Sequence, residues 1–186
     1  MASVSFYDYS IGYYTKALNV LLRILKMASS HPDIESFLEA RLAPDMLPLL
    51  MQIRIATVPP MTLVRALTSN EPVTWDQMRM ATGEQEKAWP ELIEHVEKTP
   101  GILEEVNPNE VETKSDDTKL PLYAKPDSDV PVDDFTMANG IPTVFLHVYM
   151  AYAILRFKGV DVGKKDILIP SLPGYILDEF TPKQAV

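Results

Sequence analysis

Apolar residues recur at helical spacing near the beginning of the chain. Between Ile11 and Ser30 they follow an i, i+3, i+4, i+7 pattern: Tyr14, Ala17, Leu18, Leu21, Leu22, Leu25 and Ala28. This spacing predicts an amphipathic helix with one buried face. Ser10 is a suitable N-cap, and His31-Pro32 predicts the end of the helix, because a residue before proline avoids the helical conformation.

A short helix over Ile34–Leu42, capped by Asp33, is expected next. The second long helix is predicted to begin at Asp45, where Pro48 falls within the first turn and is tolerated. Pro59-Pro60 interrupts this helix and frees two backbone carbonyls, which predicts a kink. A kink fits an irregular helix held by other contacts or a widened cavity beside it, and by itself it favours the first.

The middle of the chain carries turn and capping signals. Asn70-Glu71-Pro72 predicts a turn, and Thr82-Gly83-Glu84-Gln85 predicts a capping box that opens a third helix. Pro90 falls inside that helix and is expected to bend it. From Pro100 to Asp134 the helical period disappears and turn formers alternate with brief apolar runs. This segment is typical of an acidic loop with room for a small β-hairpin.

The last long helix is the most apolar element. Asp133 or Asp134 is expected to cap it, and Gly140 and Pro142 are expected to break its start. Residues 143–158 are apolar on nearly every side, which predicts a position in the centre of the fold.

The chain ends in an unusual segment. Gly159 is a suitable left-handed helix terminator. Residues 167–186 are rich in proline but too apolar for a free tail, so we expect them to pack along the bundle, cover a pocket mouth or reach a partner subunit. Together the elements predict an all-α helical bundle in a single domain over residues 1–186. An acidic insert at 100–134 precedes the last helix, and the tail is extended.

Composition excludes several kinds of site and partner. The chain has no cysteine, which excludes disulfides, thiolate metal sites and a catalytic thiol and suits a reducing cytoplasm. The net charge of −9 argues against nucleic acid and anionic membranes as partners, and most of that charge lies in residues 100–134. No uninterrupted apolar run reaches about 18 residues, so no membrane span is expected. The N-terminus lacks the pattern of a signal peptide.

Two blocks of sequence carry a resemblance to a known family. The first is residues 38–49 (LEARLAPDMLPL) with Gln52, and the second is residues 142–147 (PTVFLH), 151–156 (AYAILR), Gly159-Val160 and 163–166 (GKKD). With these blocks in this order and spacing, residues 5–168 resemble an uncharacterised family of small bacterial and fungal proteins. That family is related to the DinB/YfiT-like metalloenzyme bundles, and this chain resembles a fungal-type member.

The resemblance implies a four-helix bundle that is usually dimeric. In the wider superfamily, three histidines at one end of the bundle bind a divalent metal, and some members act as thiol-dependent transferases or isomerases. This chain has only three histidines, His31, His95 and His147, and the first two are expected at the surface.

The histidine pattern of that superfamily is missing here. Thr143 and Ala151 lie four residues on either side of His147, so no His-x-x-x-His pair occurs. Ala138 and Phe157 stand where relatives carry histidines. A first-row metal needs several nitrogen or carboxylate ligands that converge. We therefore predict no three-histidine metal site and no cofactor, although ligation through Asp or Glu is left open.

His147 is the first catalytic candidate. It lies on the most apolar helix, and a neutral imidazole can act as an acid or base near neutral pH. A core histidine satisfied by a carbonyl or carboxylate is the competing and more frequent interpretation. Asp45 is the second candidate, as a carboxylate that orients a histidine, against its simpler interpretation as a helix cap.

Four further residues are candidates for substrate binding: Arg41, Gln52, Tyr149 and Tyr152. Gln52 lies two turns from Asp45 on the same helix face and needs a polar partner if that face is interior. Arg41 is expected to pair with Asp45 or Glu39. The two tyrosines are more often core or interface aromatics than binding groups.

Familiar catalytic motifs are missing from the sequence. It contains no glycine-rich phosphate loop, no G-x-S-x-G elbow and no H-E-x-x-H. The first hypothesis is a metal-independent enzyme of isomerase, lyase or cyclase type, which acts by acid–base chemistry on a largely apolar small molecule in an apolar pocket inside the helical bundle. The alternative is a dimeric, non-catalytic ligand-binding or structural protein. A metal-dependent thiol transferase comes third, because the sequence lacks the histidine ligands of the superfamily metal site.

Overall fold

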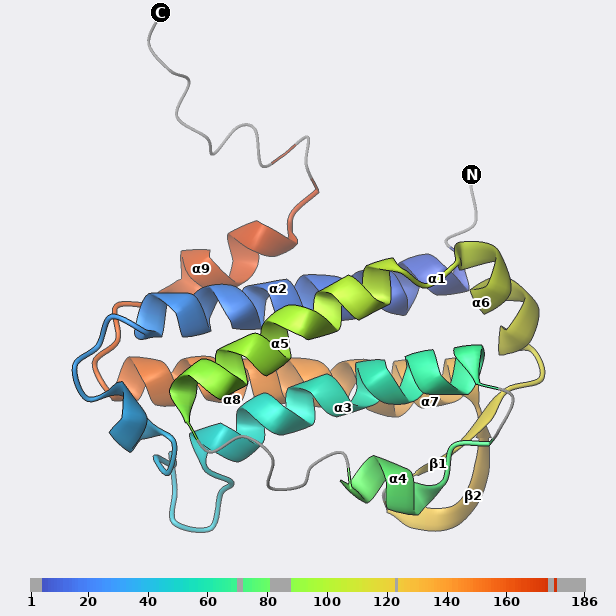
Figure 1. Ribbon diagram of the computed structural model, residues 1–186, viewed down its shortest axis with the longest axis horizontal. Coiled ribbons are helices and arrows are strands. Elements are labelled where there is room, and N and C mark those ends of the chain that lie inside the picture. The colour runs from blue at the N-terminus through green and yellow to red at the C-terminus, as the bar shows by residue number, and fades with distance from the viewer. Residues whose placement is uncertain (1–4, 70–71, 81–87, 123, 174–175, 177–186) are drawn as a thin grey trace, which may run out of the picture.

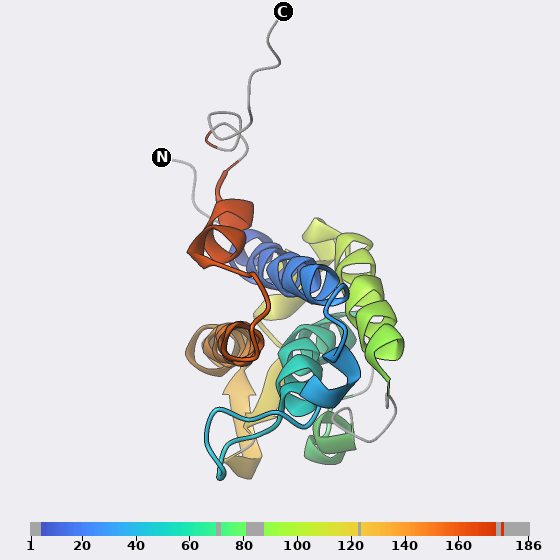
Figure 2. The same ribbon diagram turned by 90° about the vertical axis from the view of Figure 1, so that its left-hand side faces the viewer.

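Four long helices run side by side along the molecule (Figures 1 and 2). The computed structural model describes residues 5–69, 72–80, 88–122, 124–173 and 176. The helices are α1 Phe6–Tyr9, α2 Ile11–Ala28, α3 Leu49–Thr68, α4 Trp75–Met80, α5 Trp89–Glu104, α6 Pro108–Ser115, α7 Val132–Phe135, α8 Ile141–Phe157 and α9 Lys164–Leu168. The strands are β1 Lys119–Leu122 and β2 Lys125–Pro131. The chain is thus mostly helical, with a small sheet of two strands.

Helix α2 confirms the prediction made from its apolar spacing. It buries one face, and Tyr14, Leu18 and Leu21 are 0% exposed. Ser10 does not cap it as predicted, because its hydroxyl donates back to the Phe6 carbonyl in the preceding turn. The sequence analysis missed α1, whose first turn is closed by a capping box in which Ser5 is the N-cap.

The predicted start of the second long helix at Asp45 is wrong, because α3 begins at Leu49 and Pro48 is its N-cap. The residues before it form a loop that folds back on itself. The Leu49 amide donates to the Ala40 carbonyl, and the Leu50 amide to the Leu38 carbonyl. These backbone bonds hold the loop 38–48 against the first turn of α3 and leave Asp45 exposed. The short helix predicted at 34–42 is only a 3-10 turn over Ile34–Phe37, without a side-chain cap from Asp33.

Prolines interrupt the helices less than predicted. Helix α3 runs through Pro59-Pro60 to Thr68, and α5 runs through Pro100 to Glu104. Pro90 lies in the first turn of α5, where no intrahelical donor is required, so it does not bend a helix interior. The predicted capping box at residues 82–85 lies outside the described residues, as do two of the three residues of the turn predicted at 70–72.

The segment predicted as an acidic insert is partly helical. Its first residues belong to α5, and α6 follows with Asn107 as its N-cap. Strands β1 and β2 then pair in antiparallel fashion, with Leu120 opposite Val130 and a register irregularity between Leu120 and Leu122. The hairpin for which the sequence left room is therefore present. The helical period continues further than predicted, because α5 tolerates Pro100 within it.

Helix α8 is not the central helix that its composition predicted. It packs against α3 and α2 through one buried face, which includes Val144, Val148 and Leu155. Its opposite face is open: Leu146 is 53% exposed and Phe157 is 71% exposed. The bundle thus covers only part of the apolar surface of α8.

Among the described helices, only the continuous helix Val132–Phe157, which contains α8, has the length and apolar composition of a membrane span. Only 33% of its most apolar window is buried. Length and composition alone are weak evidence for a span, because core helices pass the same test.

The break predicted at Gly140 and Pro142 does not occur, because the helix is continuous up to α8. Helix α7 passes through a π-helical turn, Thr136–Gly140, directly into α8. In that turn the Ile141 amide donates to the Thr136 carbonyl, five residues back. Pro142 follows this turn directly, so its missing N–H donor falls where the regular i to i−4 pattern is already broken. The wider turn therefore accommodates residues that would interrupt a regular helix.

Gly140 is required where the π turn meets α2. A Cβ on Gly140 would lie 2.0 Å from the Tyr14 hydroxyl oxygen and 3.3 Å from the adjoining ring carbon. No side chain fits at that separation, so glycine allows the close approach.

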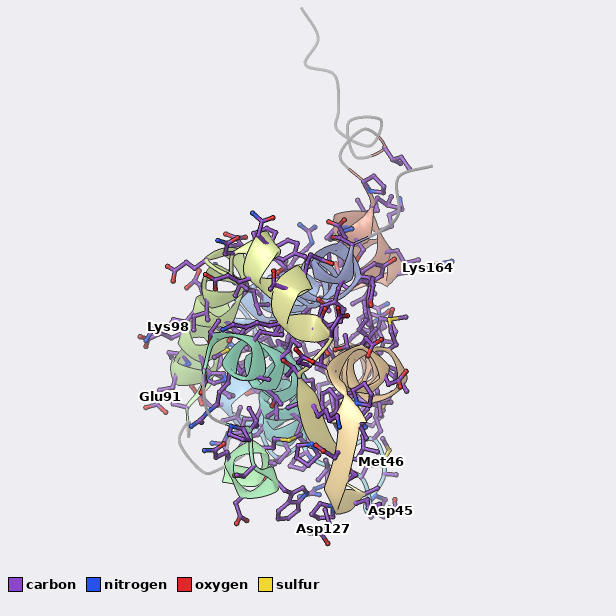
Figure 3. The ribbon with its side chains drawn as sticks, turned by 90° about the vertical axis from the view of Figure 1, so that its right-hand side faces the viewer. Asp45, Met46, Glu91, Lys98, Asp127 and Lys164 are labelled. Carbon is purple, nitrogen blue, oxygen red and sulfur yellow. The ribbon has the colours of Figure 1, made fainter. Side chains whose placement is uncertain are left out.

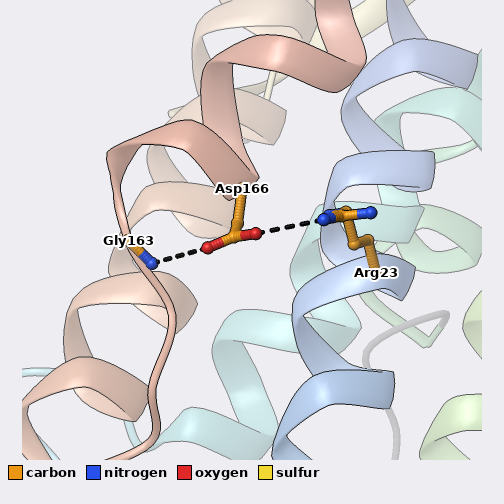
Figure 4. A network of polar contacts seen from close by, with 3 residues as sticks. All are labelled: Arg23, Gly163 and Asp166. Atoms are coloured by element: carbon orange, nitrogen blue, oxygen red, sulfur yellow. Dashed lines mark hydrogen bonds and ion pairs between the residues drawn. The ribbon is translucent and has the colours of Figure 1, made fainter. Parts of the chain in front are cut away.

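The C-terminal segment begins as predicted and is fixed to the first long helix. Gly159 has a positive φ of 93° and ends α8. Asp166 then accepts hydrogen bonds from the Gly163 amide at 2.8 Å and from Arg23 of α2 at 3.1 Å (Figure 4). Burial raises the pKa of the Asp166 carboxyl, but these two donors outweigh it and hold the pKa below its usual value. Most of the predicted tail lies outside the described residues.

The start of α5 is held by residues from a distant part of the chain. The Trp89 amide donates to the carboxylate of Glu35, 54 residues earlier, at 3.2 Å. The Trp89 indole N–H donates to the Ser29 hydroxyl at 3.0 Å. Both partners belong to the connection between α2 and α3 and tie it to α5.

Candidate functional site

His147 and Gln52 meet where α8 packs against α3. The Nδ1 atom of His147 lies 2.6 Å from Oε1 of Gln52. Gln52 is 3% exposed, and its Nε2 donates to the Leu47 carbonyl at 3.0 Å. The three groups form a chain of hydrogen bonds from the loop 38–48 through α3 to α8. Gln52 thus has the interior position and the polar partner that the sequence analysis required.

The directions of these bonds define the tautomer of His147. The Leu47 carbonyl can only accept, so the amide nitrogen of Gln52 must face it. The amide oxygen then faces His147 and accepts from Nδ1–H. In the neutral imidazole, the lone pair is therefore on Nε2.

The imidazole has a lowered pKa, and one of its nitrogens has no hydrogen bond within the described residues. Burial lowers the pKa of His147 below its ordinary value of 6.5, because a charged ring is less well solvated there. Nε2 has no hydrogen bond to the described part of the chain, so its lone pair is free to accept a proton.

The structure does not bring Asp45 or Arg41 to His147. Asp45 is exposed in the loop 38–48, and Figure 3 shows it at the surface beside Met46. Arg41 donates to the Met46 carbonyl at 2.7 Å and lies 4.0 Å from Glu39, so the expected pairing is with Glu39. Arg41 supports the loop conformation, and neither residue hydrogen-bonds to His147 within the described chain.

The two tyrosine candidates occupy different environments. Tyr149 is 41% exposed on the outer face of α8, where its ring packs 5.8 Å from that of Phe145. Tyr152 is half-buried and packs against the core. Neither tyrosine hydrogen-bonds to His147 or Gln52 among the described residues, which fits their interpretation as core or surface aromatics.

The other two histidines are less exposed than predicted. The His31 ring packs 4.7 Å from Phe37, and its Nδ1 accepts from the Asp33 amide. His95 of α5 lies with Nε2 2.9 Å from the Thr57 hydroxyl of α3. Thr57 in turn donates to a backbone carbonyl of α3. No sequence signal identifies this second histidine pair, because its members are 38 residues apart.

The described residues do not fit the three-histidine metal site of the wider superfamily. The three histidines bond to different partners on different elements, as described above. No group of three or more His, Asp or Glu side chains among the described residues is arranged to hold a metal. One imidazole nitrogen of His147 could serve as a ligand, but a first-row metal needs several.

Five hollows on the described part of the surface have volumes from 390 to 590 Å3, and His147 lines none of these five. The largest lies between α1, α6 and α7 and is lined by Tyr9, Glu112 and Asp133 among others. Burial and these two carboxylates raise the pKa of the Tyr9 phenol. None of these five hollows therefore supplies a binding pocket for His147, which lies where α8 packs against α3.

A second polar centre lies at the π turn. Tyr14 is fully buried, and its hydroxyl lies beside Thr136 and against Gly140. Burial strongly raises the pKa of the Tyr14 phenol, and the neighbouring Thr136 hydroxyl acts in the opposite direction. Neither hydroxyl has a hydrogen-bond partner of ordinary geometry within the described residues. The sequence analysis placed Tyr14 in the core but did not anticipate this centre.

Comparisons with known proteins agree on the fold and leave the activity open. A family profile described as "Domain of unknown function (DUF1993)" matches residues 6–168. A crystal structure of a DinB family member protein from Shewanella denitrificans superposes with a TM-score of 0.71 and 26% sequence identity. The match covers 87% of this chain and 90% of that one. No curated protein gives a significant match.

Proposed function

Because the chain belongs to the DUF1993 family, whose activity is unknown, we propose a function from the His147 site itself. In this proposal, the chain is a metal-independent enzyme that uses acid–base chemistry on a small, largely apolar molecule. His147 is the catalytic base, and Gln52 is the residue that positions it. Isomerisation, elimination and cyclisation are the reaction types that such a base supports.

The observation that supports this proposal is the oriented, neutral imidazole. A general base needs a free lone pair near the working pH and a fixed direction. The bond from Nδ1 to Gln52 at 2.6 Å fixes the ring, and the lowered pKa keeps it neutral. A purely structural histidine is commonly bonded at both nitrogens, whereas Nε2 of His147 has no hydrogen bond within the described residues. The neighbouring apolar residues of α8 suit a substrate with little charge.

The proposal can be tested without knowing the substrate. A base that removes a proton from carbon exchanges that proton with solvent. The protein is therefore incubated with a metabolite extract in D2O, and the extract is analysed by mass spectrometry. We expect at least one compound to gain one mass unit with the natural protein. The same compound should remain unlabelled with His147→Ala.

His31→Ala is the matched control, because His31 lies in the turn after α2 and bonds to the Asp33 amide, and it takes no part in the pair of His147 and Gln52. It should label the compound as fast as the natural protein. Labelling that persists in His147→Ala, or no labelling of any compound by the natural protein, would refute the proposed chemistry. Circular dichroism confirms that each variant is folded.

The second candidate function is a dimeric protein without catalysis. It is favoured by two observations: no described titratable group hydrogen-bonds to His147, and α8 exposes an apolar face. In this case His147→Ala would alter stability alone, and ligand binding or assembly would be the function. A metal-dependent thiol transferase is not proposed, because the described residues do not supply its metal ligands.

A further inference from the structure

The side chain of Thr143 is the neighbour of His147 one turn earlier on α8. The two residues are four positions apart, so they share a helix face, with about 5–6 Å between their Cβ atoms. Both residues are half-buried. Because His147 meets Gln52 of α3, Thr143 also lies on the flank of α8 that packs toward α3.

The Thr143 hydroxyl is not engaged by its own helix. Several helical threonines of this chain donate back to a carbonyl three or four residues earlier, as Thr57, Thr68 and Thr99 do. The carbonyl four residues before Thr143 belongs to Asn139, within the π turn, where the backbone departs from regular helical geometry. No hydrogen bond joins the Thr143 side chain to a described residue. A hydroxyl donor is therefore uncommitted one turn from the His147 base.

We infer that His147 acts on a neutral carbonyl compound, a ketone or an aldehyde, and that the Thr143 hydroxyl binds the carbonyl oxygen. Thr143 has this role only if His147 is the base, so the inference rests on the proposed function. Proton removal next to a carbonyl requires a base for the C–H and a donor for the oxygen that becomes negative. Gln52 is not that donor, because its amide already joins His147 and the Leu47 carbonyl.

The reaction consumes no second reactant. Nε2 of His147 takes the proton from the carbon next to the carbonyl. The electron pair of that C–H bond becomes the carbon–carbon double bond of an enolate, and the carbonyl π electrons move to the oxygen, which accepts from Thr143. The imidazolium then returns a proton to the same carbon or, in a conjugated substrate, to the far end of the conjugated system. The first outcome exchanges hydrogen with solvent, and the second moves a double bond.

The surroundings of the pair favour a substrate without charge. No Asp, Glu, Lys or Arg occurs in residues 141–155 of α8 or in residues 49–53, where α3 begins. In the loop 38–48, the one basic residue is Arg41, which donates to the Met46 carbonyl. A carboxylate or phosphate on the substrate would therefore lack a cation to offset its lost hydration. A ketone or an aldehyde needs only the hydroxyl.

Borohydride reduction of the metabolite extract tests the substrate class. Sodium borohydride converts ketones and aldehydes to alcohols, and acid destroys the excess reagent before the extract is neutralised and exchanged into D2O. The natural protein should label a compound in the untreated extract. In the reduced extract, that compound should be missing and its alcohol should carry no label. Labelling that still depends on His147 after reduction would overturn the inference.

Thr143→Val tests the hydroxyl, because valine keeps the shape of the side chain. It should lower the initial labelling rate about 100-fold, as expected for the loss of one donor to a developing oxyanion. Thr143→Ser keeps the hydroxyl and should retain most of the rate. Thr68→Val on α3 is the matched control, since the Thr68 hydroxyl is committed to the Val64 carbonyl, and it should label as fast as the natural protein. Circular dichroism and thermal melts establish that each variant is folded.

The possible results distinguish Thr143 from the His147 base. Labelling that needs His147 but is unchanged in Thr143→Val would overturn the role of Thr143 and leave the base in place. An equal loss in Thr143→Val and Thr143→Ser would also overturn it, because the hydroxyl would then not be the group that matters. Absence of any labelling that depends on His147 would refute the proposed function, and the role of Thr143 with it.

Discussion

The two polar centres along the α7–α8 helix differ in how their hydrogen-bonding groups are satisfied. At the His147 centre, Gln52 links the imidazole to the Leu47 carbonyl, and each group has a partner of suitable type. At the Tyr14 centre, two buried hydroxyls lie beside each other without a partner of ordinary geometry in the described chain. The first centre holds an oriented side chain, whereas the second is dominated by a close approach of helices.

This difference indicates which properties each centre contributes. A satisfied chain of hydrogen bonds fixes orientation, and removing one member leaves the others buried and unpaired. A buried hydroxyl without a partner adds no stability through hydrogen bonding, because its lost hydration is not replaced, and its neighbourhood depends mainly on shape. Substitutions at the first centre should therefore act through polar groups, and substitutions at the second through volume.

Gly140→Ala should give the largest effect, a loss of about 3 kcal/mol in the free energy of unfolding. The new Cβ would lie 2.0 Å from the buried Tyr14 hydroxyl, so the helices must separate or Tyr14 must move. Urea denaturation followed by circular dichroism measures the change. Gly101→Ala in α5 is the control, because a Cβ there meets no atom within 4 Å. A loss below about 1 kcal/mol for Gly140→Ala would show that the contact is not tight.

Gln52→Leu should cost about 2 kcal/mol, since it leaves the Nδ1–H of His147 and the Leu47 carbonyl without partners. The measurement is again urea denaturation, with the nearby Met51→Leu as a volume-conserving control that should change stability little. An unchanged free energy of unfolding for Gln52→Leu would mean that water can satisfy both the Nδ1–H of His147 and the Leu47 carbonyl. That result would contradict the proposal that Gln52 orients the imidazole.

The His147 centre should also make stability depend on pH. The folded pKa of His147 lies below 6.5, so the unfolded chain binds more protons between the two values. Above about pH 7, His147 should make no pH-dependent contribution to the free energy of unfolding. As the pH falls below about 6.5, the free energy of unfolding should decrease. Melting temperatures from pH 5 to 8 should show this slope, and His147→Gln should reduce it.

Gln52→Glu sharpens the same test. A carboxylate beside the imidazole should raise the pKa of His147 above that of the natural protein, as NMR titration of the ring can measure. A pKa of 6.5 or higher in the natural protein would contradict the effect of burial.

Tyr14→Phe should give the smallest effect, within about 0.5 kcal/mol of the natural stability, because the hydroxyl has no partner in the described chain. In the background of Gly140→Ala, the same change should recover part of the lost stability, since it removes the atom closest to the new Cβ. A double-mutant cycle by urea denaturation measures this coupling. A loss of more than about 1 kcal/mol from Tyr14→Phe alone would mean that the hydroxyl is bonded after all.

Elements with a strong local signal could be predicted from the sequence. The apolar period of α2 and the terminator Gly159 depend on neighbouring residues only, and both are present. The start of α3 could not be predicted, because backbone bonds from Leu49 and Leu50 to the loop 38–48 displace the expected Asp45 cap. Prolines within α3 and α5 were misleading for a similar reason: surrounding packing maintains helices that are locally unfavourable.

The candidate site was predictable in its parts and not in its assembly. His147 and Gln52 were each identified from residue type and position, but they are 95 residues apart and no local pattern pairs them. The pairing of His95 with Thr57 was missed for the same reason. The central position expected for α8 was wrong, because an apolar helix can satisfy its inner face within the bundle and expose the rest.

The contacts of Trp89 with Glu35 and Ser29 have a consequence for the order of folding. The first turn of α5 takes its cap from the α2–α3 connection, so this turn gains its acceptor only after the two segments meet. Closing a loop of this length requires chain entropy to be lost before the contact forms. An isolated α5 peptide should therefore fray at its N-terminal end, and in the whole chain α5 should become protected from hydrogen exchange later than α2.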